Sequence, residues 1–139
     1  MSNLQTVRAY AESVTQTPRK VALVASLVRS RTVADALVIL SHTPKRAALP
    51  VIKTIESAKA NAINNHGLDA KTLTISTLSV TSGIRLKRFK PAAMGRPRHF
   101  QKKTANILVE VTGDIKPIKP KQTAKETVKP KSNVKEEKK

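Results

Sequence analysis

A long basic stretch lies between two segments with strand periodicity, and this arrangement restricts the possible folds more than any other feature of the sequence. Residues 72–82 and 104–112 alternate apolar and polar side chains, as strands with one buried face do. The connecting stretch 83–104 has 22 residues, of which eight are Lys or Arg and none is acidic. Extended at about 3.3 Å per residue, each half of it reaches about 35 Å, whereas a domain of this size has a radius of gyration of roughly 13 Å. The sequence therefore predicts a long β-hairpin whose arm, residues 83–104, projects from the domain.

The arm has one structural alternative, which is disorder in the free protein. Its eight basic side chains repel one another, and a connection longer than about 15 residues is usually either functional or disordered. Ile84, Leu86 and Phe89 place apolar side chains between the cations, which favours strand structure.

The strand over residues 72–82 contains a phase slip. Leu73 and Ile75 fall on one face, whereas Leu78 and Val80 have the opposite parity. Because side chains alternate with a period of two along a strand, one extra residue restores the phase. We therefore expect a β-bulge near residues 76–77.

The N-terminal half of the chain predicts one strand and three helices. Residues 7–13 alternate as a strand with one buried face does. Thr17 and Pro18 then form a helix start signal, because Thr is a good N-cap and Pro at the first helical position loses no hydrogen bond. The apolar residues that follow at helical spacing predict a first helix over residues 18–30.

The second and third helices have similar start signals. Thr32 with Asp35 three residues later resembles a capping box, and this helix should end before Pro44. Thr43 and Pro44 repeat the Thr-Pro signal for the third helix, with Gly67 as its C-terminal cap.

Pro50 does not fit the interior of the third helix, because it has no N–H and clashes with the preceding turn. Either it bends the helix or regular helix begins there. The helix has an apolar face and few large side chains, which predicts close packing against another part of the backbone. The residues of this face are Val51, Ile55, Ala58 and Ala62.

The composition indicates a polyanionic partner. With 27 Lys and Arg against 9 Asp and Glu, the formal net charge is +18, and a nucleic acid would relieve this self-repulsion. No stretch approaches the roughly 20 apolar residues of a membrane span, and residues 1–13 lack a signal-peptide apolar region, so we expect a cytoplasmic protein without a membrane partner. Without cysteine, the chain has no disulfide and no thiolate zinc site. A free nucleic-acid-binding protein, such as a nucleoid or regulatory protein with a surface for duplex DNA, and a cationic membrane-surface protein are the alternatives.

Residues 116–139 differ in composition from the rest of the chain. They contain nine Lys, three Glu, three Pro and no aromatic residue, which leaves too little apolar surface to offset chain entropy. We expect a single domain over residues 1–115, with a net charge of +12, and a disordered basic tail over residues 116–139.

No pattern in the sequence indicates catalysis. The three histidines have no metal-ligand spacing, no carboxylates are paired in an apolar setting, and there is no glycine-rich phosphate loop. Asp35 aside, no base stands beside a nucleophile. We therefore expect no enzyme activity, no catalytic residue, no metal site, no cofactor and no small-molecule substrate.

Basic side chains are the candidate binding residues, because they neutralise phosphates and release counterions. Arg19 and Lys20 stand at a predicted helix N-terminus, where the helix dipole disfavours cations, so a ligand explains these cations better than the helix does. Arg29 and Arg31 stand at the other end of this helix, where they compensate its dipole. With only three aromatic residues in the chain, binding should depend on charge and shape. The predicted contacts are Arg8, Arg19, Lys20, Arg85, Lys87, Arg88, Lys90, Arg96, Arg98, His99, Lys102 and Lys103.

Three blocks of the sequence resemble a known family. The blocks are "TPRKVALVASLVRS", "VADALVILSHTPKRAALPVIKTIESAKANA" and "LKRFKPAAMGRPRHFQKKTANILVEV". In order and spacing they are similar to the bacterial large-subunit ribosomal protein L-twenty-two family over nearly all of residues 7–111. We therefore expect an α+β fold, with three helices packed on a three-stranded antiparallel sheet that extends into a long protruding β-hairpin.

The resemblance also implies a function, that of a structural constituent of the large ribosomal subunit. In that family the domain sits on the outer surface of this subunit near the tunnel exit, and the hairpin runs inward between segments of rRNA to line the polypeptide exit tunnel. The implied partners are large-subunit rRNA, neighbouring large-subunit ribosomal proteins and the nascent polypeptide at the hairpin tip. A role in subunit assembly, an indirect influence on macrolide antibiotics and a location in the cytoplasmic ribosome are implied as well.

The resemblance further identifies individual positions, and it makes the predicted basic contacts rRNA contacts. The family's basic hairpin positions fall on Lys87, Arg88, Lys90, Arg96, Lys102 and Lys103, and its usual His, Asp or Asn before the returning strand falls on Asn106. The tunnel-lining tip corresponds to Pro91, Ala92, Ala93, Met94 and Gly95. Ala92 and Met94 stand where the family usually has basic residues, so we expect a more apolar tip with fewer RNA contacts.

Overall fold

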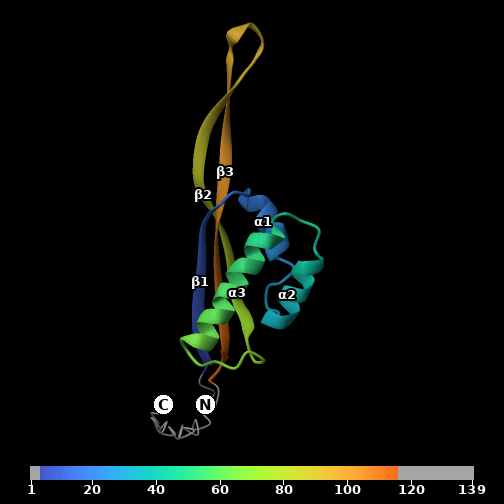
Figure 1. The fold of residues 1–139 in the computed structure, drawn as a ribbon, viewed down its shortest axis with the longest axis vertical. Coiled ribbons are helices and arrows are strands. Elements are labelled where there is room, and N and C mark those ends of the chain that lie inside the picture. The colour runs from blue at the N-terminus through green and yellow to red at the C-terminus, as the bar shows by residue number, and fades with distance from the viewer. Residues whose placement is uncertain (1–3, 116–139) are drawn as a thin grey trace, which may run out of the picture.

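The computed structural model describes residues 4–115, and Figure 1 shows their arrangement. The elements in chain order are β1 (Leu4–Val14), α1 (Pro18–Ala25), α2 (Val33–His42), α3 (Ala48–Asn64), β2 (Thr74–Pro91), the short 3-10 helix η1 (Ala93–Gly95) and β3 (Pro97–Asp114). This arrangement confirms the expected α+β fold, with three helices, a three-stranded antiparallel sheet and a long hairpin. The predicted disordered tail, residues 116–139, lies outside the described residues.

The sheet has the strand order β1-β3-β2, so the last strand of the chain lies at its centre. β3 pairs antiparallel with both neighbours. The register of β2 against β3 shifts between Ile75 and Thr77, which leaves Ser76 as an extra residue. This is the β-bulge expected from the change of phase, and it lets both Ile75 and Leu78 reach the core.

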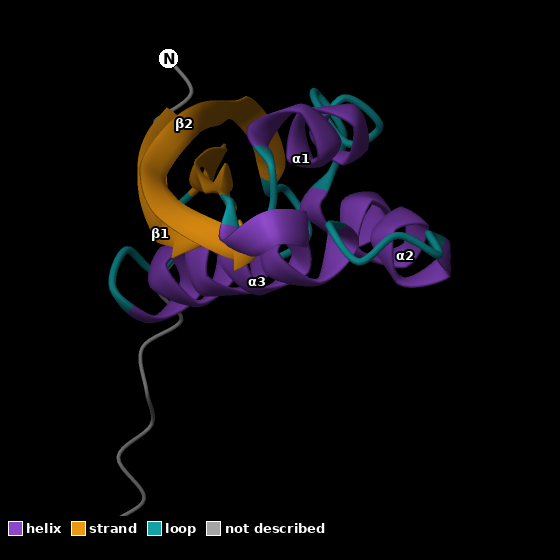
Figure 2. Ribbon diagram, turned by 90° about the horizontal axis from the view of Figure 1, so that it is seen from above, coloured by secondary structure: helices purple, strands orange, loops and turns teal. Residues whose placement is uncertain are grey.

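The core lies between the sheet and the helices. Figure 2 shows the strands curled, with the helices along one side of them. α3 packs against β1 and β3, α1 packs against β2, and α2 packs against α3. Ala58 and Ala62 bring α3 close to the sheet, as the small side chains on its apolar face predicted. The expected core faces of β3 and α3 are fully buried, with Ala105, Ile107, Val109, Val111, Val51, Ile55, Ala58 and Ala62 all 0% exposed.

The end of α1 differs from the prediction. The helix ends at Ala25 rather than at Ser30, because residues 26–30 continue as turns. In this segment Val28 N–H donates to Ala25 C=O, three residues back, at 3.2 Å. Ser30 then has a φ of 58°, a left-handed conformation that no helix continues through.

The start of α3 also differs from the prediction, because the helix begins at Ala48 and not directly after Thr43. Thr43 still belongs to the end of α2, since its hydroxyl donates to Ile39 C=O at 2.8 Å. Pro50 is therefore in the first turn of α3, where its missing N–H costs no hydrogen bond. Of the two alternatives for this proline, the start of regular helix is confirmed. Gly67 follows the end of α3 with a φ of 63°.

The N-caps expected at Thr32 and Thr17 behave differently. Thr32 Oγ1 accepts a hydrogen bond from Asp35 N–H at 3.2 Å and donates to Asp35 Oδ2 at 2.8 Å, so the cap of α2 is confirmed. Thr17 stands at the N-cap of α1 with Pro18 after it, but its side chain makes no capping hydrogen bond. The start of α1 therefore depends on the proline and on packing.

Candidate nucleic-acid interface

β2 and β3 continue past the helices as a two-stranded arm (Figure 1). Cross-strand pairs run without interruption from Arg85 and Lys103 to Pro91 and Pro97 near the tip. Every residue from 84 to 103 is exposed, so the arm has no core of its own. The expected projecting hairpin is confirmed, and its strands remain paired from residues 85 and 103 to residues 91 and 97.

The register of the arm places like charges opposite each other. Arg85 faces Lys103, and Lys90 faces Arg98. Directly opposite side chains have Cβ atoms about 5 Å apart, and like charges at that spacing are destabilising. The arm contains no acidic residue that could offset this repulsion. A polyanion whose phosphates surround the arm would offset it.

The remaining predicted arm contacts lie on both faces of the ribbon. These residues are Lys87, Arg88, Arg96, His99 and Lys102, and all are exposed. Because side chains alternate along a strand, Lys87 shares a face with Arg85, whereas Arg88 lies on the opposite face. The arm is therefore suited to being enclosed by phosphates, and less suited to lying flat on one surface.

Polar contacts and one close backbone approach hold the root of the arm. Thr104 is only 3% exposed, and its hydroxyl donates to Ile84 C=O at 2.7 Å. Asn106 Oδ1 accepts from Ser13 N–H at 2.9 Å, which ties the end of β1 to β3. A Cβ added to Gly83 would lie 2.5 Å from Thr104 Oγ1 and 2.9 Å from Asn106 Oδ1, so this position requires glycine. The Asn106 position noted in the resemblance thus has a structural role.

The tip is a tight turn without charge at its end. Ala92 N–H donates to Arg96 C=O at 3.0 Å and closes the turn. Met94 and Gly95 both have positive φ, 58° and 68°, a region that glycine tolerates and methionine rarely adopts. The Met94 side chain is 93% exposed. The predicted tip, from Pro91 to Gly95, therefore presents an uncharged and mostly apolar end.

Arg8 is a predicted contact that lies on β1, outside the arm. Its Nε lies 2.8 Å from Glu110 Oε1, and within residues 4–115 this is the only ion pair. Glu110 is six positions from Thr104 on the same strand, which corresponds to about 20 Å. The Arg8 side chain is still 74% exposed, so it can reach a phosphate as well as the carboxylate.

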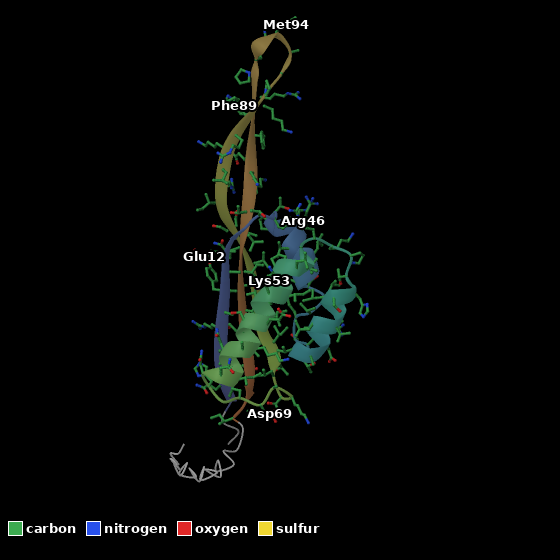
Figure 3. All side chains as sticks on the ribbon, in the orientation of Figure 1. Glu12, Arg46, Lys53, Asp69, Phe89 and Met94 are labelled. Carbon is green, nitrogen blue, oxygen red and sulfur yellow. The ribbon has the colours of Figure 1, made fainter. Side chains whose placement is uncertain are left out.

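A second basic surface lies beside the start of α1, where Arg19 and Lys20 are exposed as expected. Lys20 lines a groove of about 680 Å³ together with Lys45 and Arg46 from the turn before α3. Lys53 lines a smaller hollow that shares Arg46. Figure 3 shows Arg46 at the end of the domain from which the arm leaves. Lys45, Arg46 and Lys53 were not among the predicted contacts. In the sequence, Lys45 and Arg46 form a basic pair directly after Thr43 and Pro44, whereas Lys53 has no such signal.

Arg29 and Arg31 serve the fold. Arg29 Nε donates to Leu78 C=O at 3.2 Å, and Arg31 Nε donates to Leu27 C=O at 2.9 Å. Arg29 thus reaches a carbonyl on β2, and Arg31 reaches one in the turns that follow α1. Because α1 ends at Ala25, neither arginine is in its last turn, and the expected compensation of the helix dipole is not found. Their side chains stabilise the fold through these carbonyl contacts instead.

The histidines are dispersed over the fold. His42 ends α2, His66 Nδ1 lies 3.0 Å from Gln5 Nε2, and His99 is on the arm. Within residues 4–115, no group of three or more His, Asp or Glu side chains could hold a metal ion. Among the helices of the described region, none is both long and apolar enough to cross a membrane.

The fold and the arm together define a class: small, basic α+β proteins with a projecting cationic hairpin suited to a polyanion. The ribosomal protein L22p/L17e family matches residues 9–112 of the chain. The chain belongs to this family, which confirms the resemblance carried by the three sequence blocks. A ribosomal protein of this family is a structural component and not an enzyme, so the expectation of no catalytic activity is confirmed by the family.

Relatives in this family match most of the chain. The large ribosomal subunit protein uL22 of Oceanobacillus iheyensis is 46% identical over 105 residues, which are 76% of this chain and 93% of that protein. The uL22 proteins of Desulfitobacterium hafniense and Mesoplasma florum are 44% and 42% identical over 108 and 107 residues. These matches cover 78% and 77% of this chain, and 95% and 96% of those proteins.

Proposed function

We propose that this chain is a structural constituent of the large ribosomal subunit. In this proposal it binds large-subunit rRNA through its basic arm, helps the subunit to assemble and lines the polypeptide exit tunnel with its hairpin tip. Its location is the cytoplasmic ribosome. Its partners are large-subunit rRNA, neighbouring large-subunit ribosomal proteins and the nascent polypeptide at the tip. The family and the shared name of the three relatives support the subunit assignment.

One observation carries the RNA-binding part of the proposal: residues 84–103 of the arm are all exposed, and its eight basic side chains have no acidic neighbour on the arm. A ribbon without a core gains little from burial, and its opposed like charges oppose its formation. Phosphates packed around it would supply the missing stabilisation through charge neutralisation and counterion release. The arm is therefore suited to folded RNA that surrounds it.

The groove beside α1 extends this contact surface to the domain. Lys20, Lys45 and Arg46 line it, and it lies towards the end from which the arm leaves (Figure 3). A single RNA segment that passes the root of the arm would meet these cations next. We therefore add Lys45, Arg46 and Lys53 to the rRNA contacts.

The uncharged tip suits the inner surface of a passage for other polypeptides. Residues 91–95 carry no charge of their own, so a chain passing the end of the tip contacts no charged side chain there. Met94, which is 93% exposed, offers a flexible apolar contact that does not select one sequence.

The test is sedimentation of the full-length chain in a cell lysate at moderate salt. We expect the protein in the large-subunit fraction, and a triple variant with Arg88→Ala, Lys90→Ala and Arg96→Ala partly in the free fraction. Lys71→Ala is the matched control, because Lys71 is exposed in the loop before β2 and lies outside both basic surfaces. Recovery of the unaltered chain mostly in the free fraction would contradict the proposal.

Competition at one ionic strength separates rRNA from the alternative partners. Large-subunit rRNA fragments should displace the chain from duplex DNA and from anionic vesicles. In the triple variant the dependence of rRNA affinity on salt should become less steep, by about one unit of logarithmic slope for each lost phosphate contact. Stronger binding to DNA than to rRNA would favour a free DNA-binding protein.

A further inference from the structure

Two of the three aromatic residues of the chain lie on the arm, where no core exists to receive them. Phe89 on β2 is 69% exposed, and Phe100 on β3 is 41% exposed. Exposed phenyl rings are unfavourable in water, because covering their apolar surface would release the water around them. Their position on a coreless ribbon indicates that a partner covers them.

The two rings lie on opposite faces of the ribbon, and only one of them has a partner there. Phe100 faces Arg88 across the strands, and Lys90 Nζ lies 5.4 Å from its ring centroid, a cation–π distance. Phe89 faces His99 instead, and within residues 4–115 no cation lies over its ring. Phe89 is thus the aromatic face that the arm leaves open.

The neighbours of Phe89 on its face complete a small polar and aromatic site. Lys87 and Gln101, paired with each other, come next on the side of the domain, and Pro91 and Pro97 come next on the side of the tip. The prolines stiffen the backbone there and offer no N–H. The Gln101 amide can both donate to and accept from a base edge, and the Lys87 ammonium can reach a phosphate.

We propose that Phe89 and His99 form a stacking platform for one unpaired nucleobase of RNA, with Gln101 hydrogen-bonding to the base edge and Lys87 contacting the adjoining phosphate. Every base has a π-face, so an open ring on a cationic ribbon recognises an unstacked base without needing a particular sequence. This inference rests on the proposed rRNA binding. It adds one contact that depends on base stacking to a surface otherwise governed by charge and shape.

The chain contains no Trp, so a single Trp can report on this contact. We would compare full-length Phe89→Trp with Ile84→Trp, because Ile84 is also on the arm and 65% exposed. The probes are an rRNA fragment with unpaired loops, an RNA duplex of equal length, and inorganic polyphosphate, which has charge but no bases. We expect strong quenching of the residue-89 fluorophore by the looped fragment, weaker quenching by the duplex, and none by polyphosphate. Equal quenching by polyphosphate, or equal quenching at residues 84 and 89, would overturn the proposal.

Affinity measurements separate this inference from the proposed function. Phe89→Leu keeps an apolar side chain but removes the ring, and it should weaken binding of the looped fragment about 5- to 150-fold, the range for one lost base stack. The salt dependence should stay that of the unaltered chain, because no cation is lost. If the unaltered chain binds rRNA and Phe89→Leu binds it equally well, only the stacking platform is wrong. If the unaltered chain does not bind rRNA, the proposed function itself is wrong.

Discussion

Lys90 and Arg98 lie directly opposite each other across the two strands of the arm. Both side chains are exposed, and the arm carries no acidic residue between residues 83 and 104. The Lys90 ammonium lies 5.4 Å from the centroid of the Phe100 ring. The electron-rich face of this ring offsets part of the repulsion between the two cations. The pairing of the strands thus brings together two cations that repel each other in the free protein.

Reversing one charge of this pair should stabilise the arm and weaken RNA binding. Arg98→Glu places a carboxylate opposite Lys90, so we expect the backbone amides of residues 86–90 and 98–102 to exchange about 1.5- to 5-fold more slowly in the free protein. Hydrogen exchange measures this, and Arg98→Gln, which only removes the repulsion, should show a smaller effect. Unchanged exchange together with unchanged rRNA affinity would mean that this pair matters neither to the arm nor to its ligand.

The root of the arm should not tolerate a side chain at residue 83. In Gly83→Ala the new Cβ would lie 2.5 Å from Thr104 Oγ1, and relieving this contact should lower the free energy of unfolding by about 1–3 kcal/mol. Denaturation followed by circular dichroism measures the change. Combined with Thr104→Ala, which removes the closest atom, the loss should be smaller than the sum of the two single losses. Strict additivity would show that the two positions do not clash.

The two threonines at helix N-caps provide a matched pair. Thr32→Ala removes the hydroxyl that accepts from Asp35 N–H, so it should lower the free energy of unfolding by about 1 kcal/mol. Thr17→Ala should change it much less, because the Thr17 side chain makes no capping hydrogen bond. Equal effects in urea denaturation would contradict this difference between the starts of α1 and α2.

Close packing of α3 on the sheet should make its small side chains intolerant of larger ones. Ala58 is 0% exposed between α3 and the sheet, so Ala58→Leu should lower the free energy of unfolding by about 1–3 kcal/mol. Ala60→Leu lies two residues away on the exposed face and should have little effect. Thermal unfolding of the two variants distinguishes them, and equal melting temperatures would mean that α3 has room at Ala58.

The groove beside α1 should contribute to rRNA affinity independently of the arm. Arg46→Ala removes a cation that lines both hollows, and it should weaken binding of an rRNA fragment and reduce the salt dependence by about one unit of logarithmic slope. Lys71→Ala removes a cation near Asp69, which Figure 3 shows at the opposite end of the domain, and it should leave the rRNA affinity and its salt dependence unchanged. Filter binding over a salt series measures these quantities, and identical behaviour of the two variants would remove the groove from the interface.

Local pattern was sufficient for much of the fold and for most of the arm. The opposite parity of Ile75 and Leu78 located the bulge, because the pleat of a strand has a period of two. Thr32 with Asp35 located the start of α2, because a cap needs only neighbouring residues. The predicted end of the first helix at Ser30 was wrong, because turns with hydrogen bonds of 3-10 type replace regular helix after Ala25. The predicted start of the third helix after Thr43 was wrong, because Thr43 still bonds to a carbonyl of the preceding helix.

By itself, then, the sequence determines which segments are strands and helices, that the connection between the last two strands is long and cationic, and that the chain has the residues of a family of ribosomal proteins. The tertiary structure decides that β3 lies at the centre of the sheet, that Lys90 faces Arg98, that Phe89 faces His99, and that Lys20 shares a groove with Arg46. The physical reason is the range of the interactions. Periodicity and capping depend on residues within one or two turns, whereas register and grooves depend on backbone segments that are distant in sequence and meet only after the core has formed.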